Sequence, residues 1–267
     1  MSSTDTTQGR KTALITGASG GIGYEFARIF AREGYNLVLV ARTESKLAQI
    51  KGDLEKKHGI SVKVLAKDLA EPSAPQEIFS ELQGESISVD ALINNAGFTV
   101  YGPFAETSLQ KELELLQVNM VALTHLTKLF LPGMIEKGWG KVLNVASTAA
   151  FQPGPLMACY YASKAYVLFF SEALAVELEG TGITVTALCP GPTETGFQKR
   201  GNMEDSKLVA GRKIMDARTV AKAGYRALMK GQPVVIPGLS NLVIAEAVRF
   251  MPRRLVARIV GRAQERV

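Results

Sequence analysis

The sequence predicts an α/β fold with a single domain, in which helices cover both faces of a doubly wound parallel sheet in three layers. Short apolar segments alternate with longer amphipathic ones along most of the chain, which is the pattern of successive βαβ units. The first apolar segment, 12–16, runs directly into a glycine-rich turn and a helix. With 267 residues and 46% hydrophobic content, the chain can bury one large core.

The expected elements alternate regularly along the chain. A helix at 24–33 follows the first strand, and the next strand is expected at 36–40 (NLVLV). Because parallel strands need a crossover between them, this order implies a sheet covered on both faces. The remaining expected elements are strand 61–66, helix 75–83, strand 91–93, helix 108–137, strand 141–146, helix 157–179, strand 183–188, helix 217–230 and strand 233–236.

We expect three segments along the chain. Residues 1–10 are polar and are interpreted as a disordered leader, because they lack the apolar stretch of a targeting sequence. Residues 11–238 form the α/β domain, and residues 239–267 form a basic helical extension. Two cysteines, Cys159 and Cys189, in a chain without a signal-peptide pattern indicate a reducing, cytoplasmic setting.

Basic residues are concentrated at the end of the chain. The formal net charge is +6, and between residues 249 and 267 six arginines stand against one acid. The rest of the chain is nearly neutral, which argues against nucleic-acid binding. The final helix could lie on an anionic membrane, pack onto a partner subunit, or cover the fold with a solvated arginine face. Its arginines recur at every fourth residue, at Arg254, Arg258, Arg262 and Arg266.

The turn after the first strand reads GASGGIG, from Gly17 to Gly23. Glycines let the backbone approach a pyrophosphate, and the following helix offers unpaired N–H groups and a positive dipole end. Strand, glycine turn and helix together predict a dinucleotide site, whereas the turn alone could be purely structural. Its candidate cofactor-binding residues are Gly17, Ser19, Gly21, Ile22 and Gly23.

The end of the second strand carries Ala41-Arg42-Thr43. An acidic residue in this place would bind the adenosine ribose of NAD, whereas Arg42 can pair with the 2′-phosphate of NADP. We therefore expect NADP. Arg42 could also be an ordinary solvated loop residue, and the nearby Glu44 leaves NAD open.

The strongest chemical signal is Tyr160-x-x-x-Lys164, with Ser147 thirteen residues before the tyrosine. In a helix, Tyr160 and Lys164 lie one turn apart on one face. An ammonium favours the phenolate, so Lys164 is expected to lower the pKa of Tyr160 toward the range useful for proton transfer. Ser147, at the end of a strand, could bond the same substrate oxygen. Alone, the tyrosine and lysine could be a chance spacing.

Further candidates follow other strands. Asn94-Asn95-Ala96-Gly97 ends one strand and could pack against a planar ligand or form a tight turn, and Asn119 is either a satisfied core amide or a functional one. Residues 196–216 are poorly periodic and could form a lid or a solvated loop. His58 and His125 have no clustered partners, so we expect no metal site. Candidate pocket or core residues are Phe98, Tyr101, Phe151, Leu156, Met157, Phe197 and Met203.

These motifs together resemble the short-chain dehydrogenases/reductases. Over about residues 10–238, the chain has in order Thr16-Gly17-x-x-x-Gly21-x-Gly23, Asn94-Asn95-Ala96-Gly97, Asn119, Ser147, Tyr160-x-x-x-Lys164 and Pro190-Gly191. The resemblance implies one Rossmann domain that binds NAD(P), usually in a homodimer or homotetramer. It also implies that Tyr161, adjacent to the motif tyrosine, is a packing or pocket-wall residue.

The resemblance also implies roles for individual residues. Tyr160 would be the general acid and base, Lys164 would lower its pKa and hold the nicotinamide ribose, and Ser147 would orient the substrate oxygen. Asn119 would support a proton relay through water. The cofactor-binding set then extends to Asp68 and Leu69 beside the adenine, Asn95 near the ribose, Ala96, Gly97, Pro190, Gly191, Thr193, and Thr195 at the carboxamide or phosphates.

The function expected from these residues is reversible NADPH-dependent reduction of a ketone or aldehyde to an alcohol, with a small and mainly apolar substrate. Two alternatives remain. One is a cofactor-binding sensor or scaffold without turnover, which would need only the glycine turn. The other is a nucleotide-sugar epimerase or dehydratase that retains NAD, although that branch has a differently spaced glycine motif and more C-terminal sequence.

Overall fold

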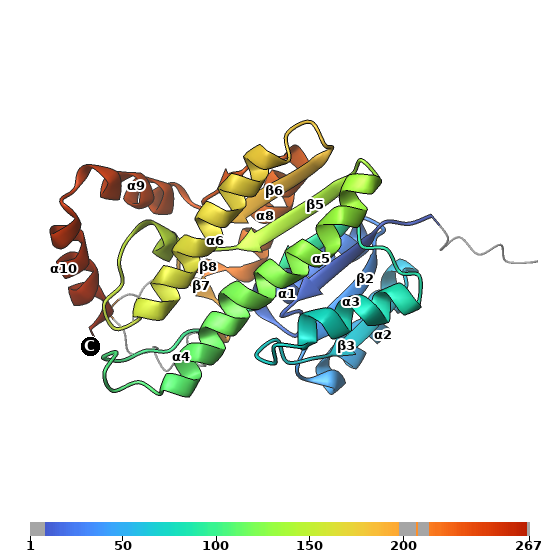
Figure 1. Ribbon diagram of the computed structural model, residues 1–267, viewed down its shortest axis with the longest axis horizontal. Helices are drawn as coiled ribbons and strands as arrows, with labels where there is room; N and C mark the ends of the chain where they lie inside the picture. Colours follow the sequence, from blue (N-terminus) through green and yellow to red (C-terminus); the bar gives the residue numbers. More distant parts are fainter. Residues whose placement is uncertain (1–8, 198–206, 208–213, 266–267) are drawn as a thin grey trace, which may run out of the picture.

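The fold is a seven-stranded parallel sheet between two layers of helices, in a computed structural model that describes residues 9–197, 207 and 214–265 (Figure 1). The strand order is β3-β2-β1-β4-β5-β6-β9, so the chain winds outward in both directions from β1. The doubly wound parallel sheet expected from the sequence is confirmed. The strands are β1 (Thr12–Thr16), β2 (Asn36–Ala41), β3 (Val62–Ala66), β4 (Ala91–Asn94), β5 (Gly140–Val145), β6 (Ile183–Leu188) and β9 (Val234–Val235).

Each strand sends alternate side chains into two separate cores. In β1, Ala13 and Ile15 join the core under α1, α2 and α8, whereas Leu14 joins the core under α3 and α5. The first layer contains α1 (Gly21–Arg32), α2 (Glu44–His58) and α8 (Ala217–Lys230); the second contains α3 (Ala74–Gly84), α4 (Leu109–Leu116), α5 (Leu123–Glu136) and α6 (Ala158–Glu177).

Two helices differ from their expected form. Helix α2 is absent from the expected elements because its sequence is highly charged and buries only Leu47, Ile50 and Leu54. The single helix expected at 108–137 is divided, because a π-helical stretch, η1 (Gln117–Ala122), separates α4 from α5. A π-helix bonds i to i+5, often at functional sites, and here it contains Asn119.

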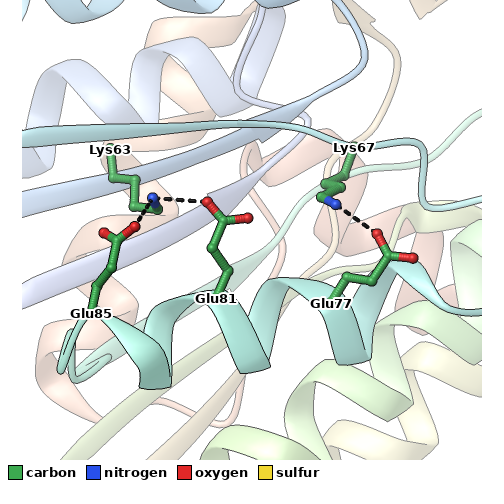
Figure 2. A network of polar contacts seen from close by, with 5 residues as sticks. All are labelled: Lys63, Lys67, Glu77, Glu81 and Glu85. Carbon is green, nitrogen blue, oxygen red and sulfur yellow. Dashed lines mark hydrogen bonds and ion pairs between the residues drawn. The ribbon is translucent and has the colours of Figure 1, made fainter.

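Ion pairs fasten α3 to the edge strand β3 (Figure 2). Lys63 Nζ lies 2.8 Å from Glu81 Oε1 and 2.6 Å from Glu85 Oε1. Lys67 Nζ lies 2.6 Å from Glu77 Oε2 at the other end of the helix. The pairing leaves the charge of Lys67 largely neutralised where β3 ends.

One helical run, Leu109–Glu136, is long and apolar enough to cross a membrane by length and composition alone, with a mean hydropathy of 1.2. This run is α4, η1 and α5 together, and 44% of its most apolar window is buried inside the fold. Leu126 and Phe130 pack into the core, whereas Leu109, Leu113 and Val121 are exposed.

The chain ends in α9 (Leu239–Ala247), a 3₁₀ turn η3 (Val248–Phe250) and α10 (Arg253–Gln264), which lie together at one end of the molecule (Figure 1). Val256 and Val260 of α10 pack against Met157 and Tyr161 at the start of α6 (Ala158–Glu177). Pro252 lies between η3 and α10, directly before the last helix begins. Residues 1–8 of the expected leader, Met203, Arg266, and most of the expected lid at 196–216 lie outside the described residues.

Candidate active site

Ser147, Tyr160 and Lys164 line one pocket of about 220 Å³ at the carboxyl edge of the sheet. Strand β5 delivers Ser147, and the turn η2 (Thr148–Phe151) begins immediately after it, with Ser147 Oγ accepting from the Ala149 N–H at 3.1 Å. Helix α6 carries Tyr160 and Lys164, one turn apart. The structure therefore brings together the three side chains that the sequence predicted.

Burial is the main cause of the pKa shifts of Tyr160 and Lys164. It raises the pKa of Tyr160 to about 12, while a side-chain hydrogen bond with Ser147 lowers that pKa in part. Burial also lowers the pKa of Lys164 to about 8, opposed by the neighbouring Cys189 thiol. Both shifts favour the neutral forms, because a charge is poorly solvated here.

The lowering of the Tyr160 pKa that was expected from Lys164 is not seen in this structure. Lys164 Nζ donates to the Val145 carbonyl at 2.7 Å and lies 5.8 Å from the centre of the Tyr160 ring. The ammonium thus bonds to the strand end rather than to the phenol, and the pKa of Tyr160 is raised rather than lowered.

Asn119 lies behind the pocket, 1% exposed. Its Nδ2 donates to Phe98 O and to Ser163 Oγ, both at 3.1 Å, and its Oδ1 accepts from the Phe98 N–H at 3.2 Å. The amide therefore joins η1, α6 and the loop after β4. This geometry makes Asn119 a satisfied core amide placed next to the reactive side chains.

The glycine turn fits a dinucleotide pyrophosphate. Gly17 and Gly21 have φ of 66° and 55°, which disfavour any residue with a Cβ, and a Cβ on Gly23 would lie 2.4 Å from the Gly17 carbonyl oxygen. Helix α1 begins at Gly21 without a side-chain cap and without an acid in its first turn. Its N–H groups and dipole are therefore open to a phosphate.

Most of the predicted cofactor residues surround the same pocket. Asn95 was expected near the cofactor ribose. Its Nδ2 instead donates to Thr16 O at 2.8 Å and so holds the loop after β4 against β1. Gly23 packs against the Gly17 carbonyl within the turn, and Asn119 lies behind the residues that line the pocket. The lining contains Gly17, Gly21, Ile22, Asn95, Ala96, Gly97, Pro190, Gly191, Thr193 and Thr195.

Ser19, Arg42, Asp68 and Leu69 line a second cavity, which adjoins the first through Gly17, Ala96 and Gly97. Arg42 is 71% exposed, and its Nη1 lies 3.7 Å from Asp68 Oδ2. This loose pair leaves the guanidinium free to turn toward a phosphate. Lys46 also lines the cavity and was missed by sequence reasoning, because a lysine on a charged helix has no distinguishing signal.

The residues proposed for the substrate pocket are divided among different places. Met157 and Phe197 line the catalytic pocket, and the Phe197 ring lies 5.4 Å from that of Tyr160. The others do not share this pocket: Phe98 and Tyr101 line the second cavity, Phe151 lines an apolar groove beside α6, and Leu156 occupies a left-handed conformation (φ 66°) before the catalytic helix. Of the two alternatives left open for these residues, pocket or core, the catalytic pocket therefore applies to Met157 and Phe197 and not to these four.

Sequence reasoning missed Gln264 at the pocket wall. It comes from the end of α10 and donates from Nε2 to the Tyr161 hydroxyl at 2.5 Å. Tyr161 is buried, and its ring packs edge-on against Tyr160, which agrees with its assignment to the pocket wall. About 100 residues separate Gln264 from the motif, so no local spacing could have indicated the contact. Among the described residues, no three His, Cys, Asp or Glu side chains gather into a metal-binding group.

A dinucleotide cradle that opens into a pocket with Ser, Tyr and Lys defines the class of NAD(P)-binding oxidoreductases with a doubly wound sheet. The particular family follows from the sequence: a model described as short chain dehydrogenase matches residues 11–206. The chain belongs to the short chain dehydrogenase family.

Named relatives agree with this family. The chain is 39% identical to a very-long-chain 3-oxoacyl-CoA reductase of Phaeosphaeria nodorum, with 79% of this chain and 63% of that protein covered. It is 34% identical to the ketoacyl reductase HetN of Nostoc sp., over 86% of this chain and 79% of HetN. A short-chain dehydrogenase from Sphingobium yanoikuyae, solved with NADPH, has a TM-score of 0.82 and 33% identity, covering 90% of this chain and 92% of that one.

Proposed function

We propose that this protein is an NADPH-dependent reductase that interconverts a ketone or aldehyde and an alcohol. The observation that carries the proposal is that Ser147, Tyr160 and Lys164 line one pocket together with the glycine cradle. NADPH, when bound, supplies the hydride. A cofactor-binding sensor or scaffold without turnover would need only the glycine turn, and not Ser147, Tyr160 and Lys164.

Tyr160, Ser147 and Lys164 each have a separate role in the reaction. With a pKa of about 12, Tyr160 keeps its proton at neutral pH and is ready to give it to a developing alkoxide. Ser147 orients the carbonyl oxygen through its hydroxyl. Lys164, with a pKa of about 8, is mostly charged at pH 7, so a cation lies 5.8 Å from the centre of the Tyr160 ring when proton transfer leaves a phenolate there.

The preference for NADPH is supported by the charges around the second cavity. Arg42 and Lys46 line it, and the guanidinium is only loosely paired. Lys67 contributes less, because Glu77 holds its ammonium at 2.6 Å. The similar Sphingobium yanoikuyae enzyme was solved with NADPH, which agrees with this assignment. In this proposal Arg42 pairs with the 2′-phosphate.

For the substrate we propose a mainly apolar carbonyl compound. Met157, Tyr161 and Phe197 line the same pocket as the polar cradle and give it apolar surface. Both named relatives described above are reductases of oxoacyl or ketoacyl compounds, so keto groups on acyl chains are the first substrates to test. The size and apolar character of the pocket should then decide which of these keto compounds is reduced.

The test is NADPH oxidation, followed by absorbance, across a panel of aldehydes, ketones and β-ketoacyl thioesters, with NADH in parallel. We expect turnover of at least one carbonyl class and a higher kcat/KM with NADPH. The Tyr160→Phe protein is the control for background oxidation. Tightly retained cofactor without net oxidation would contradict the proposal and favour the epimerase, the dehydratase or the sensor.

The C-terminal segment supports a further proposal, peripheral contact with an anionic membrane. Phe250 and Leu239 are 89% and 76% exposed, and Arg253, Arg254 and Arg258 are exposed on the adjoining helix. Aromatic and aliphatic side chains next to arginines suit the boundary between acyl chains and anionic headgroups. A cytoplasmic protein docked in this way would meet lipophilic substrates at the membrane.

Vesicle sedimentation tests this contact. We expect binding to vesicles that contain phosphatidylserine, weaker binding to pure phosphatidylcholine, and loss of binding in the double variant Phe250→Ser with Arg254→Ser. The matched control, Phe104→Ser with Arg226→Ser, removes the same side chains from exposed positions elsewhere. Equal sedimentation of all three proteins would rule out the membrane contact.

We also propose a homodimer or homotetramer, supported by exposed apolar side chains on α4 and α6. Leu109 is 71% exposed, and Phe169 and Val176 are 66% and 67% exposed. Sedimentation velocity should give a particle of at least twice the monomer mass, and Phe169→Glu should lower it. A monomer at micromolar concentration would contradict the proposal.

A further inference from the structure

The catalytic pocket is small for the two molecules that it has to hold. Its volume is about 220 Å³, and the glycine turn and Thr195 line it together with Ser147 and Tyr160. Sites for small molecules usually measure about 300–1,000 Å³, and here the nicotinamide end of the cofactor shares the space with the substrate. A carbonyl compound with a long or bulky chain therefore requires part of the wall to move.

The part of the wall that comes from α10 is held less firmly than the rest. This helix lies beyond the carboxyl edge of the sheet, and Gln264 in its last turn lines the pocket (Figure 1). Strand β5 and helix α6, which carry the catalytic groups, bury their side chains in the large cores of the sheet. Segments with few buried side chains open at the lowest free energy. In residues 239–265, the buried side chains are Ala245, Val256, Val260 and Gln264.

Hydrogen bonds form a latch between the end of α10 and the pocket. The Gln264 side chain bonds to the Tyr161 hydroxyl, and its main-chain carbonyl accepts from the Tyr101 hydroxyl, both at 2.5 Å. The exposed Glu265 pairs with Lys207 at 2.9 Å. One end of the Gln264 amide is bonded to Tyr161, and the other is buried without a partner among the described residues. Opening exchanges these bonds for bonds to water and hydrates the unpaired end, so the net cost of breaking the latch is small.

The packing around α10 also leaves it free to move. An apolar groove of about 920 Å³ is lined on one side by α6 and on the other by η3 and the first turn of α10. The start of α10 therefore has no close-packed neighbour across this groove. Further along the helix, Gly261 faces Pro155 and has no side chain with which to interlock.

We propose that α10 is a movable wall that sets the size limit of the substrate, and that it swings outward to admit carbonyl compounds too long or bulky for the closed pocket. The inference rests on the proposed reductase function and extends its substrate class to such compounds. Outward movement withdraws Gln264 and removes the valines that pack against Met157 and Tyr161, which enlarges the pocket on its apolar side. Ser147 and Tyr160 stay in place, because β5 and α6 hold them. Small carbonyl compounds react in the closed form.

A disulfide between α10 and the segment before α6 tests the movement. A Cβ on Gly261 would lie 3.5 Å from Pro155 Cβ, which suits a disulfide, so Pro155→Cys with Gly261→Cys should form one on oxidation. The two substrates are the acetoacetyl and 3-oxododecanoyl thioesters of N-acetylcysteamine. In the oxidised protein, the ratio of kcat/KM for the long thioester to that for the short one should fall at least about tenfold. Dithiothreitol should restore the wild-type ratio.

The single variants Pro155→Cys and Gly261→Cys are the matched controls, and the ratio in neither should respond to oxidation or reduction. Cys159 and Cys189 are free thiols, so thiol titration and peptide mass mapping verify that the new cysteines pair with each other. Tyr101→Phe removes one bond of the latch and should shift the ratio in the opposite direction, toward the long thioester.

Hydrogen exchange in the wild-type protein measures the opening without any substitution. The amides of α10 should exchange at least about tenfold faster than those of α6. Equal exchange in the two helices, or an unchanged ratio in the oxidised double variant, would overturn the movable wall and leave the reductase function intact. An equal loss with both thioesters would overturn it as well, because the disulfide would then act on Tyr160 and not on access. Absence of turnover with every carbonyl would contradict the proposed function, and hydrogen exchange would still decide whether α10 opens.

Discussion

The two ends of the cofactor cleft are built differently. At the catalytic end, Lys164 is 5% exposed and bonds to Val145 at 2.7 Å, and Asn119 is bonded to two neighbouring segments. At the adenosine end, Arg42 is 71% exposed and its ion pair with Asp68 is 3.7 Å long. The catalytic groups are thus buried and bonded to their neighbours, whereas the residue proposed to select the cofactor carries an exposed charge. Substitutions at the two ends should therefore differ in size and in kind.

The largest effect is expected at the catalytic phenol. Tyr160→Phe removes the proton donor but keeps the ring that packs against Phe197, so kcat/KM should fall about 10³-fold while the NADPH dissociation constant changes less than about threefold. Stopped-flow kinetics and fluorescence titration measure the two quantities. Turnover within about tenfold of wild type would assign the acid to another group, for which Tyr161 is the nearest phenol.

A smaller effect is expected at the adenosine end. Arg42→Asp should lower the ratio of kcat/KM with NADPH to that with NADH by about a hundredfold, because it replaces an attraction to the 2′-phosphate by a repulsion. The kcat with saturating NADH should stay close to that of wild type, since the catalytic end is untouched. Arg218→Asp, on the exposed start of α8, is the matched control. An unchanged ratio in Arg42→Asp would remove this residue from cofactor selection.

The buried ammonium should be visible in stability. The pKa of Lys164 is about 8 in the folded protein and ordinarily 10.5, so folding must bury a charge below pH 8 and progressively less of one as pH rises to 10.5. The penalty is full below pH 8 and absent above 10.5. The difference in unfolding free energy, Lys164→Met minus wild type, should therefore be about 2 kcal/mol more positive at pH 7 than at pH 10. Urea unfolding at both pH values tests this, and a difference that grows with pH would contradict it.

The smallest effect belongs to the exposed ion pairs between β3 and α3. Glu85→Gln removes a contact of 2.6 Å with Lys63, yet both side chains reach solvent and Glu81 remains as a second partner (Figure 2). The unfolding free energy should fall by less than about 1 kcal/mol, and less still in 0.5 M salt. A loss above about 2 kcal/mol in urea unfolding would mean that exposed pairs matter here as much as buried groups.

What the sequence could predict depended on how local each signal was. The glycine turn and the Tyr160-x-x-x-Lys164 spacing lie within single elements, and the sheet follows from alternating apolar segments, so both could be inferred before the structure. Helix α2 escaped notice because solvated charges hide its three buried residues. The contact of Gln264 with Tyr161, the bond of Lys164 to Val145 and the raised pKa of Tyr160 depend on tertiary packing and burial, which no spacing encodes.

The π-helical stretch Gln117–Ala122 has a consequence for sequence change in this protein. Its wide turn accommodates one residue more than a regular helix would, and Asn119 owes its direction to that extra residue. Deleting one residue there would join α4 and α5 into one regular helix whose flanking side chains keep their faces, whereas the side chains within the stretch itself would lose their present directions. A deletion at this position would thus make the helix regular but break the hydrogen bonds of Asn119 with Phe98 and Ser163. The stretch should therefore tolerate deletion less well than the helices on either side of it.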